Sequence, residues 1–244
     1  MQCEVRRERL AALTGGKDCV FVDAKGSPEA AVAAVESALL TLVPALGFSP
    51  SADAQILSPG NQGLLGGRQL NERLRPLLNP HFTPAPVVTE TGDHSTTDGP
   101  PLPWGRGDKV IQTVNNYDKE VYNGDVGIVT SLEHHATATV EFVVGKKRRE
   151  VKYQGKKELR QLLPAWAITV HKSQGSEYEV VIVPVTMMHS FINSRNLLYT
   201  ALTRSQALCI VVGDRRAVHM ALAKTDGGGR WTGLRQHLLA RSGK

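Results

Sequence analysis

Cysteine is scarce in this sequence. Its 244 residues contain three cysteines, Cys3, Cys19 and Cys209, and their separations match no metal-ligand spacing. Cys19 and Cys209 lie inside apolar runs, where a free cysteine behaves as a small buried hydrophobe. This usage favours a reducing compartment.

Long apolar segments are scarce too. We expect no stretch to reach the length of a membrane span, and the N-terminal MQCEVRRERL has the basic start of a signal peptide without its apolar centre. No internal repeat is visible. With 41% hydrophobic residues, the chain is expected to be a cytoplasmic protein with one core, or with a core and a small second unit.

Positive charge is concentrated in one segment. Lysine and arginine number 29 against 23 acidic residues, an excess of six, and residues 146–160 alone contribute eight basic and two acidic side chains. A phosphate backbone attracts such clusters through Coulomb forces and counterion release. Lysine and arginine also keep exposed strand edges from pairing. On charge alone, a nucleic-acid surface and a solvated hairpin edge both remain open.

Apolar runs alternate with helical patterns at both ends of the chain. Short β-branched or apolar runs predict strands at 19–24, 54–60, 180–185 and 208–213. Helical spacing predicts helices from Ser27-Pro28 to about Leu42, over 68–79 and over 194–206. These patterns predict an α/β fold whose parallel sheet is covered on both faces.

The middle of the chain has a different pattern. Residues 89–107 are polar and rich in glycine and proline, which indicates a loop or linker. From Asp108 to about Leu163 several short strands follow one another, with an Asn123-Gly124 turn of the hairpin kind. This region therefore predicts a small β-barrel inserted into the α/β unit.

Two segments carry polar side chains suited to phosphate. TVHKSQGSEY (169–178) precedes a predicted parallel strand and is therefore expected at one lip of the sheet, where doubly wound proteins bind ligands. Gly175 permits close backbone approach, and Glu177 can accept from hydroxyls. The alternative is a polar turn that satisfies its own backbone. The donors in this turn are Thr169, His171, Lys172, Ser173 and Gln174.

The second segment is NLLYTALTR (196–204). On a helix its Asn196, Thr200, Thr203 and Arg204 share one polar side while the leucines face the sheet. An arginine on such a rigid support suits phosphoryl transfer, because its planar cation can stabilise charge on a transferred phosphate. The alternative is an ordinary surface arginine.

Together these segments resemble the RecD-like branch of the superfamily 1 helicases. Residues 166–185 resemble motif V, residues 196–205 motif VI and residues 107–129 motif IVa, and residues 55–80 are similar to the motif IV region. The resemblance implies a RecA-like parallel-sheet domain (P-loop NTPase type) formed by residues 1–107 and 164–244, with an inserted SH3-like barrel at 108–163.

The resemblance also implies roles for single residues. Glu177 would contact the nucleotide ribose, Gln174 and Gly175 would border the ATP cleft, and Arg204 would be the arginine finger on the γ-phosphate. Two positions depart from the family pattern, since Gln62 and Val114 stand where basic residues are usual. Residues implied to lie toward single-stranded DNA, with the basic hairpin added from its charge, are Asn115, Asn116, Tyr117, Thr169, His171, Lys172, Ser173, Lys146, Lys147, Arg148 and Arg149.

The chain has no P-loop of the form G-x-x-x-x-G-K-[ST] and no Walker B acidic pair after a strand. LTGGKDC (13–19) has Gly-Gly-Lys without a following serine or threonine. The resemblance therefore implies the C-terminal part of an ATP-dependent 5′ to 3′ DNA helicase, inactive alone, with ATP and Mg²⁺ bound only together with an N-terminal half. A stand-alone single-stranded nucleic-acid-binding module is the alternative, and the retained Arg204 favours the first. The pathway, whether repair, recombination or conjugation, stays open.

Overall fold

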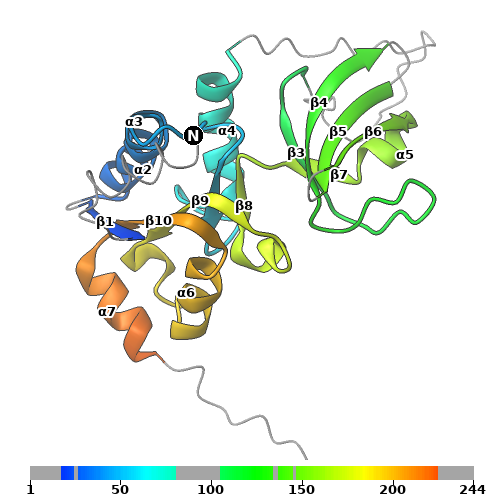
Figure 1. The fold of residues 1–244 in the computed structure, drawn as a ribbon. Helices are drawn as coiled ribbons and strands as arrows, with labels where there is room; N and C mark the ends of the chain where they lie inside the picture. Colours follow the sequence, from blue (N-terminus) through cyan, green and yellow to red (C-terminus); the bar gives the residue numbers. More distant parts are fainter. Residues whose placement is uncertain (1–17, 25–26, 81–104, 134–136, 145–146, 225–244) are drawn as a thin grey trace, which may run out of the picture.

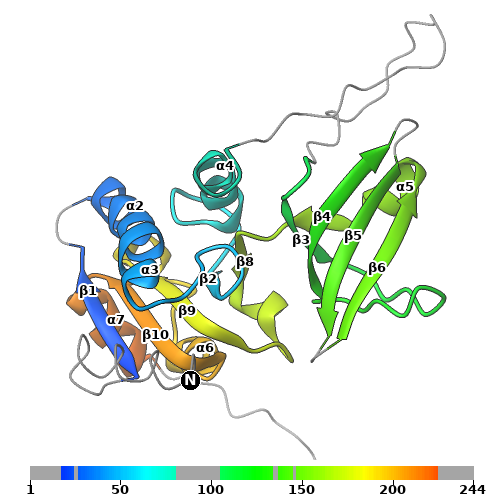
Figure 2. The same ribbon diagram turned by 45° about the horizontal axis from the view of Figure 1, so that its top comes forward.

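The computed structural model describes residues 18–24, 27–80, 105–133, 137–144 and 147–224. These residues form two five-stranded sheets that stand side by side (Figures 1 and 2). Sheet A is wholly parallel, with the strand order β1-β10-β9-β2-β8. Sheet B is antiparallel, with the order β6-β5-β4-β3-β7.

Sheet A contains the four strands that the apolar runs predicted and one more. The additional strand, β8, has only three residues, ends at the first residue of the TVHKSQGSEY segment and was not predicted. It pairs with β2 and forms one edge of the sheet. The strands are β1 (Cys19–Asp23), β2 (Ala54–Ser58), β8 (Ala167–Thr169), β9 (Tyr178–Val185) and β10 (Ser205–Gly213).

Both faces of sheet A are buried, as its continuous apolar runs predicted. Along β9, Val180 and Ile182 enter the core on one face, while Val181 and Val183 enter the core on the other. Figure 1 shows α2 and α3 on the first side and α6 and α7 on the second. The covering helices are α2 (Pro28–Ser37), α3 (Val43–Ala45), α4 (Gly67–Leu78), α6 (Arg195–Leu202) and α7 (Arg215–Ala223).

The helix that starts at Pro28 is longer than expected. Ser27 caps it, since the Ser27 hydroxyl accepts a hydrogen bond from Ala30 N at 3.2 Å, and a π-helical turn, Ala38–Leu42, joins α2 to α3. The resulting 18 residues, Pro28–Ala45, are long and apolar enough to cross a membrane, so the expectation that no such stretch exists was wrong. In the structure its buried side chains pack on sheet A.

Sheet B has a core of its own, in which Phe142 and Tyr153 are fully buried. Four of its strands match the predicted short strands. The short helix α5 and the closing strand β7 were not predicted, because each has five residues or fewer and no clear periodicity. The elements are β3 (Lys109–Gln112), β4 (Val126–Glu133), β5 (Thr137–Val144), β6 (Lys147–Gln154), α5 (Gly155–Leu159) and β7 (Leu162–Pro164).

Buried polar side chains join the two sheets. Lys109, at the start of β3, donates from Nζ to the Ala54 carbonyl of β2 at 3.0 Å. Gln55 donates from Nε2 to the carbonyls of Ala165 (3.0 Å) and Trp166 (3.3 Å), where the chain returns from sheet B. Because these groups are buried and hydrogen-bonded, the connections between the sheets have a defined geometry.

Helix α4 supports the same junction. The Asn71 amide donates to the Ala167 carbonyl at 2.6 Å and accepts from Ala167 N at 3.0 Å, which satisfies the outer edge of β8. Near the end of α4, Arg75 forms an ion pair with Asp108, and Asn79 donates to the same carboxylate at 3.0 Å. Side-chain contacts therefore hold sheet B against sheet A both where the chain enters sheet B and where it leaves it.

Candidate nucleotide and nucleic-acid surfaces

The segment after β8 runs from one end of sheet A to the other and does not stay at a single end. Thr169 pairs with Ser58 at the carboxyl end of β2, whereas Tyr178 pairs with Ser205 at the amino end of β10. Between them lie the 3₁₀ turn Val170–Ser173 and a left-handed glycine, Gly175, with φ of 87°. Because β8 and β9 are both parallel to β2, the connection must cross from one end of the sheet to the other. The expectation of a single ligand-binding lip was therefore wrong.

Arg204 lies at the amino end of the sheet and is held by two hydrogen bonds. Helix α6 ends at Leu202, so Arg204 follows the helix cap and is not on the helix, contrary to expectation. Its Nε donates to the Thr200 carbonyl and its Nη1 to the Ser176 carbonyl, both at 3.2 Å. Carbonyls at a helix C-terminus favour a cation, so α6 and the 174–177 turn together fix a half-buried guanidinium.

The remaining residues predicted for the nucleotide belong to the 174–177 turn, whose Ser176 carbonyl accepts from this guanidinium. Tyr178 N donates to the Arg204 carbonyl at 2.9 Å, which joins the end of the turn to the end of α6. Glu177 is exposed and accepts from Gln206 Nε2 at 2.8 Å. Gln174 is exposed, and no atom lies within 4 Å of where a β-carbon on Gly175 would be. Glu177 and Arg204 thus lie at the amino end of sheet A, and Gln174 and Gly175 are exposed in the turn that leads to it.

At the other end of the turn, only some of the predicted DNA-facing groups are exposed. The Ser173 hydroxyl is fully buried and donates to the Val170 carbonyl at 2.7 Å, and Thr169 is buried and accepts from Lys172 N at 3.4 Å. His171 is exposed, and Lys172 is half-buried, with its pKa lowered by burial. His171 and Lys172 are therefore the groups of this turn that a ligand can reach directly.

The loop between β3 and β4, residues 113–125, packs against this turn. A β-carbon on Gly124 would lie 3.6 Å from the Lys172 carbonyl oxygen, and Val126 packs against the core on the α6 side of sheet A. The structure therefore brings the motif IVa residues of sheet B next to the motif V residues of sheet A.

Within this loop, the two predicted asparagines mainly support the backbone. The Asn115 side chain accepts from Asn123 N at 2.9 Å, and the Asn116 side chain accepts from Lys119 N at 3.1 Å. Tyr117 is 73% exposed. A second exposed aromatic residue, Tyr122, was missed by the sequence analysis, although its position directly before the Asn123-Gly124 turn marks it as part of the same loop.

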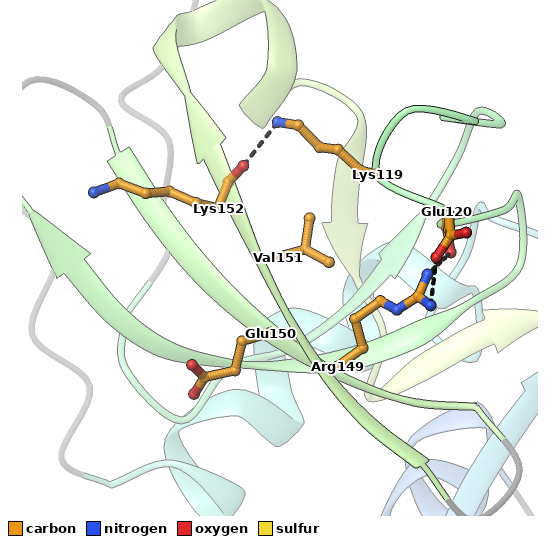
Figure 3. Close-up of a pocket in the computed structure, with 6 residues that line it drawn as sticks. All are labelled: Lys119, Glu120, Arg149, Glu150, Val151 and Lys152. Carbon is orange, nitrogen blue, oxygen red and sulfur yellow. Dashed lines mark hydrogen bonds and ion pairs between the residues drawn. The ribbon is translucent and has the colours of Figure 1, made fainter.

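The described part of the basic hairpin is paired with carboxylates. Arg148 lies 3.0 Å from Glu141, and Arg149 lies 2.5 Å from Glu120, an ion pair that Figure 3 shows across a shallow hollow. Lys146 lies outside the described residues, as does the Lys147 side chain.

Over the whole of residues 108–163 the sequence has ten basic and eight acidic residues, so the local excess is only two. Within the described residues, Arg148, Arg149 and Lys152 of the cluster seen in the sequence are paired with carboxylates in space. The DNA-binding role of this hairpin stays a prediction.

Two family models match the regions that form these surfaces. The ATP-dependent RecD-like DNA helicase SH3 domain matches residues 70–142, which include the 113–125 loop. The UvrD-like helicase C-terminal domain matches residues 164–212, which include the turn after β8, helix α6 and Arg204.

Several proteins share this similarity over part of their length. The chain is 36% identical over 170 residues to the ATP-dependent RecD2 DNA helicase of Deinococcus radiodurans, covering 70% of this chain and 21% of that protein. It is 35% identical over 152 residues to the RecBCD enzyme subunit RecD of Mycobacterium tuberculosis, covering 62% and 24%. The chain thus spans about a fifth to a quarter of these relatives. A Bacteroides Pif1 helicase in complex with ADP-AlF3 and ssDNA is 22% identical, with a TM-score of 0.47 over 78% of this chain and 46% of that one.

Proposed function

Since the chain belongs to the RecD-like helicases and carries their UvrD-like C-terminal domain and their SH3 domain, we propose that it supplies the second half of an ATP-dependent DNA helicase motor. In this function Arg204 acts as the arginine finger toward a nucleotide held by an N-terminal half. The surface formed by His171, Lys172 and the 113–125 loop contacts single-stranded DNA. The motor works on DNA in the cytoplasm.

The observation that carries this proposal is the placement of two surfaces at the two ends of one short connection. Residues 170–177 run from the DNA-side groups His171 and Lys172 to the nucleotide-side group Glu177. Arg204 is hydrogen-bonded to this connection through the Ser176 carbonyl. The nucleotide edge and the DNA surface are therefore joined by one short connection, through which we propose that a shift of one edge moves the other.

The residues present fit one side of a nucleotide only. A guanidinium has five N–H donors, and two of those of Arg204 are used on carbonyls, which leaves others for a phosphate oxygen. The sequence offers no P-loop to hold the phosphates and Mg²⁺. ATP and Mg²⁺ are therefore expected to bind with the N-terminal half, which supplies the phosphate bed, while Arg204 contributes positive charge across the interface.

A stand-alone single-stranded nucleic-acid-binding module is the second candidate. The juxtaposition of the 113–125 loop with Lys172 favours it, because that surface needs no nucleotide. The two carbonyl bonds that hold Arg204 favour the motor part, since a binding module has no use for a fixed cation at the opposite edge.

The test compares ATP hydrolysis by residues 1–244 alone and after mixing with a P-loop-bearing RecD-like half. The chain alone should show no hydrolysis above background, with or without DNA. The mixture should hydrolyse ATP and respond to single-stranded DNA. Arg204→Ala in the mixture should reduce turnover by about 10³- to 10⁵-fold, the range for arginine fingers, with DNA affinity retained.

Arg195→Ala is the matched control, because Arg195 is an exposed arginine at the other end of α6. It should leave turnover unchanged. Magnesium-dependent hydrolysis by the chain alone that survives repurification and disappears in Arg204→Ala would contradict the half-motor proposal. Equal turnover of Arg204→Ala and Arg195→Ala in the mixture would contradict the finger role of Arg204, and a mixture no more active than the P-loop-bearing half alone would favour the binding module.

A further inference from the structure

We propose that Tyr117 and Tyr122 form a stacking site for the unpaired bases of a single nucleic-acid strand. This inference rests on the proposed function and specifies which chemical part of the strand the 113–125 loop recognises. The bases stack on the tyrosine rings of the loop, while the phosphates contact the neighbouring turn that carries His171 and Lys172.

The two rings are exposed together. Tyr117 is 73% and Tyr122 46% exposed, and their ring centroids lie 6.1 Å apart at an interplanar angle of 74°. In this edge-to-face arrangement one ring supports the edge of the other and leaves aromatic surface open to solvent. Stacking a base on such a ring is favourable and tolerates any sequence, because every base has a π-face.

The loop that carries the rings is held in place before any ligand binds. Val121, between the rings in sequence, is fully buried in the core of sheet B. Asn116 and Val121 exchange backbone hydrogen bonds of 2.7 and 3.0 Å, and Tyr122 N donates to the Asp125 carboxylate at 2.8 Å. A preformed site loses little conformational entropy on binding, so the stacking energy is retained as affinity.

The charges of the loop disfavour a phosphate site at the rings themselves. Residues 113–125 contain three carboxylates and one lysine. That lysine, Lys119, lies 2.5 Å from Glu158, and Glu120 is paired with Arg149; Figure 3 shows both loop side chains directed toward β6. Bases are therefore the part of a nucleic acid that this loop suits best.

Side chains that can bind phosphates lie on the other sheet, in the turn against which the loop packs. Gly124, two residues after Tyr122, packs against Lys172. The exposed His171 and the half-buried Lys172 are thus close enough for phosphates to follow the turn while the adjacent bases reach the tyrosines. Charge and stacking are supplied by different elements, so the two contributions can be separated by experiment.

The test measures the affinity of residues 1–244 for oligo(dT) and for an abasic deoxyribose-phosphate strand of equal length. Wild type should prefer oligo(dT). The double variant Tyr117→Leu/Tyr122→Leu should lose about 5- to 150-fold in affinity for oligo(dT), the equivalent of stacking one base, and should bind the abasic strand as wild type does. The slope of log affinity against log salt should not change, because no phosphate contact is lost.

Two further variants separate stacking from folding. Tyr117→Phe/Tyr122→Phe keeps both rings and should keep the affinity for oligo(dT). Tyr199→Leu removes an exposed tyrosine of α6 and should have no effect. Equal wild-type affinity for both strands, or an unchanged affinity in the leucine double variant, would overturn the stacking site while leaving the proposed function intact. Failure of wild type to bind any strand would instead refute the DNA-binding part of the proposed function, and the stacking site with it.

Discussion

The buried ammonium of Lys109 predicts a pH-dependent stability. Burial lowers the pKa of Lys109 from 10.5 to about 8, with Asp53 acting weakly in the opposite direction. A pKa lowered by this amount corresponds to about 3 kcal/mol of unfavourable free energy for the charged form in the folded protein. The Ala54 carbonyl, which accepts from Nζ, compensates only part of the lost hydration.

The sign follows from proton binding. Below about pH 8 both the folded and the unfolded chain hold the proton, so the folded protein bears the full cost of burying the charge. Between about pH 8 and 10.5 the unfolded chain binds more protons than the folded chain, so the free energy of unfolding rises with pH. Lys109→Met cannot titrate and should lack this rise.

The assay is urea unfolding of wild type and Lys109→Met between pH 7 and 10.5, followed by the fluorescence of tryptophan, one of which, Trp166, is buried at the junction of the sheets. The stability of the variant relative to wild type should decrease by about 3 kcal/mol across this range. Lys156→Met, at an exposed position of α5, should follow wild type. Parallel stability curves for wild type and Lys109→Met would show that the Lys109 ammonium does not titrate differently in the folded and unfolded protein.

Two further changes test the packing that positions the candidate surfaces. Asn71→Ala removes both hydrogen bonds to the first residue of β8 and should lower the free energy of unfolding by about 1–3 kcal/mol. Gln69→Ala, at an exposed position of the same helix, should change the free energy of unfolding little. Equal effects of the two substitutions would contradict the role of the Asn71 amide. Gly213→Ala would force a methyl group into the Val185 carbonyl and should therefore lower the melting temperature strongly. Gly155→Ala, the control, strains a left-handed backbone but brings the methyl group near no other atom, so its effect should be much smaller. A larger loss for Gly155→Ala than for Gly213→Ala would contradict this prediction.

Local sequence patterns determined most of sheet A and most of sheet B. Continuous β-branched runs predicted β9 and β10, and Ser27-Pro28 predicted the start of α2, because strand propensity and helix capping act between near neighbours. The three-residue strand β8 had no such signal. It exists because β2 and Asn71 satisfy its two sides, and both contacts come from distant parts of the chain.

The residue types of the candidate site could also be predicted, but the solvent exposure and the position of their side chains could not. The turn pattern identified Ser173 and His171 alike as donors, yet the fold buries the first and exposes the second. Arg204 was predicted on a helix and lies after it, held by a carbonyl of the preceding turn. Side-chain direction depends on where a helix ends and what packs against it, which a periodic pattern locates only to within a residue or two.

The charge and the aromatic pair depended most on tertiary structure. The clustering of cations at 146–160 is visible in the sequence, whereas the pairing of Glu141 with Arg148 and of Glu120 with Arg149 depends on the fold. The fold also placed Tyr122 against Tyr117 and the loop that carries both against the turn of sheet A. Strand register and the packing of one sheet on another decide these neighbours. Strand register and sheet packing both result from the burial of the whole apolar surface, so neither can be predicted from a short stretch of sequence.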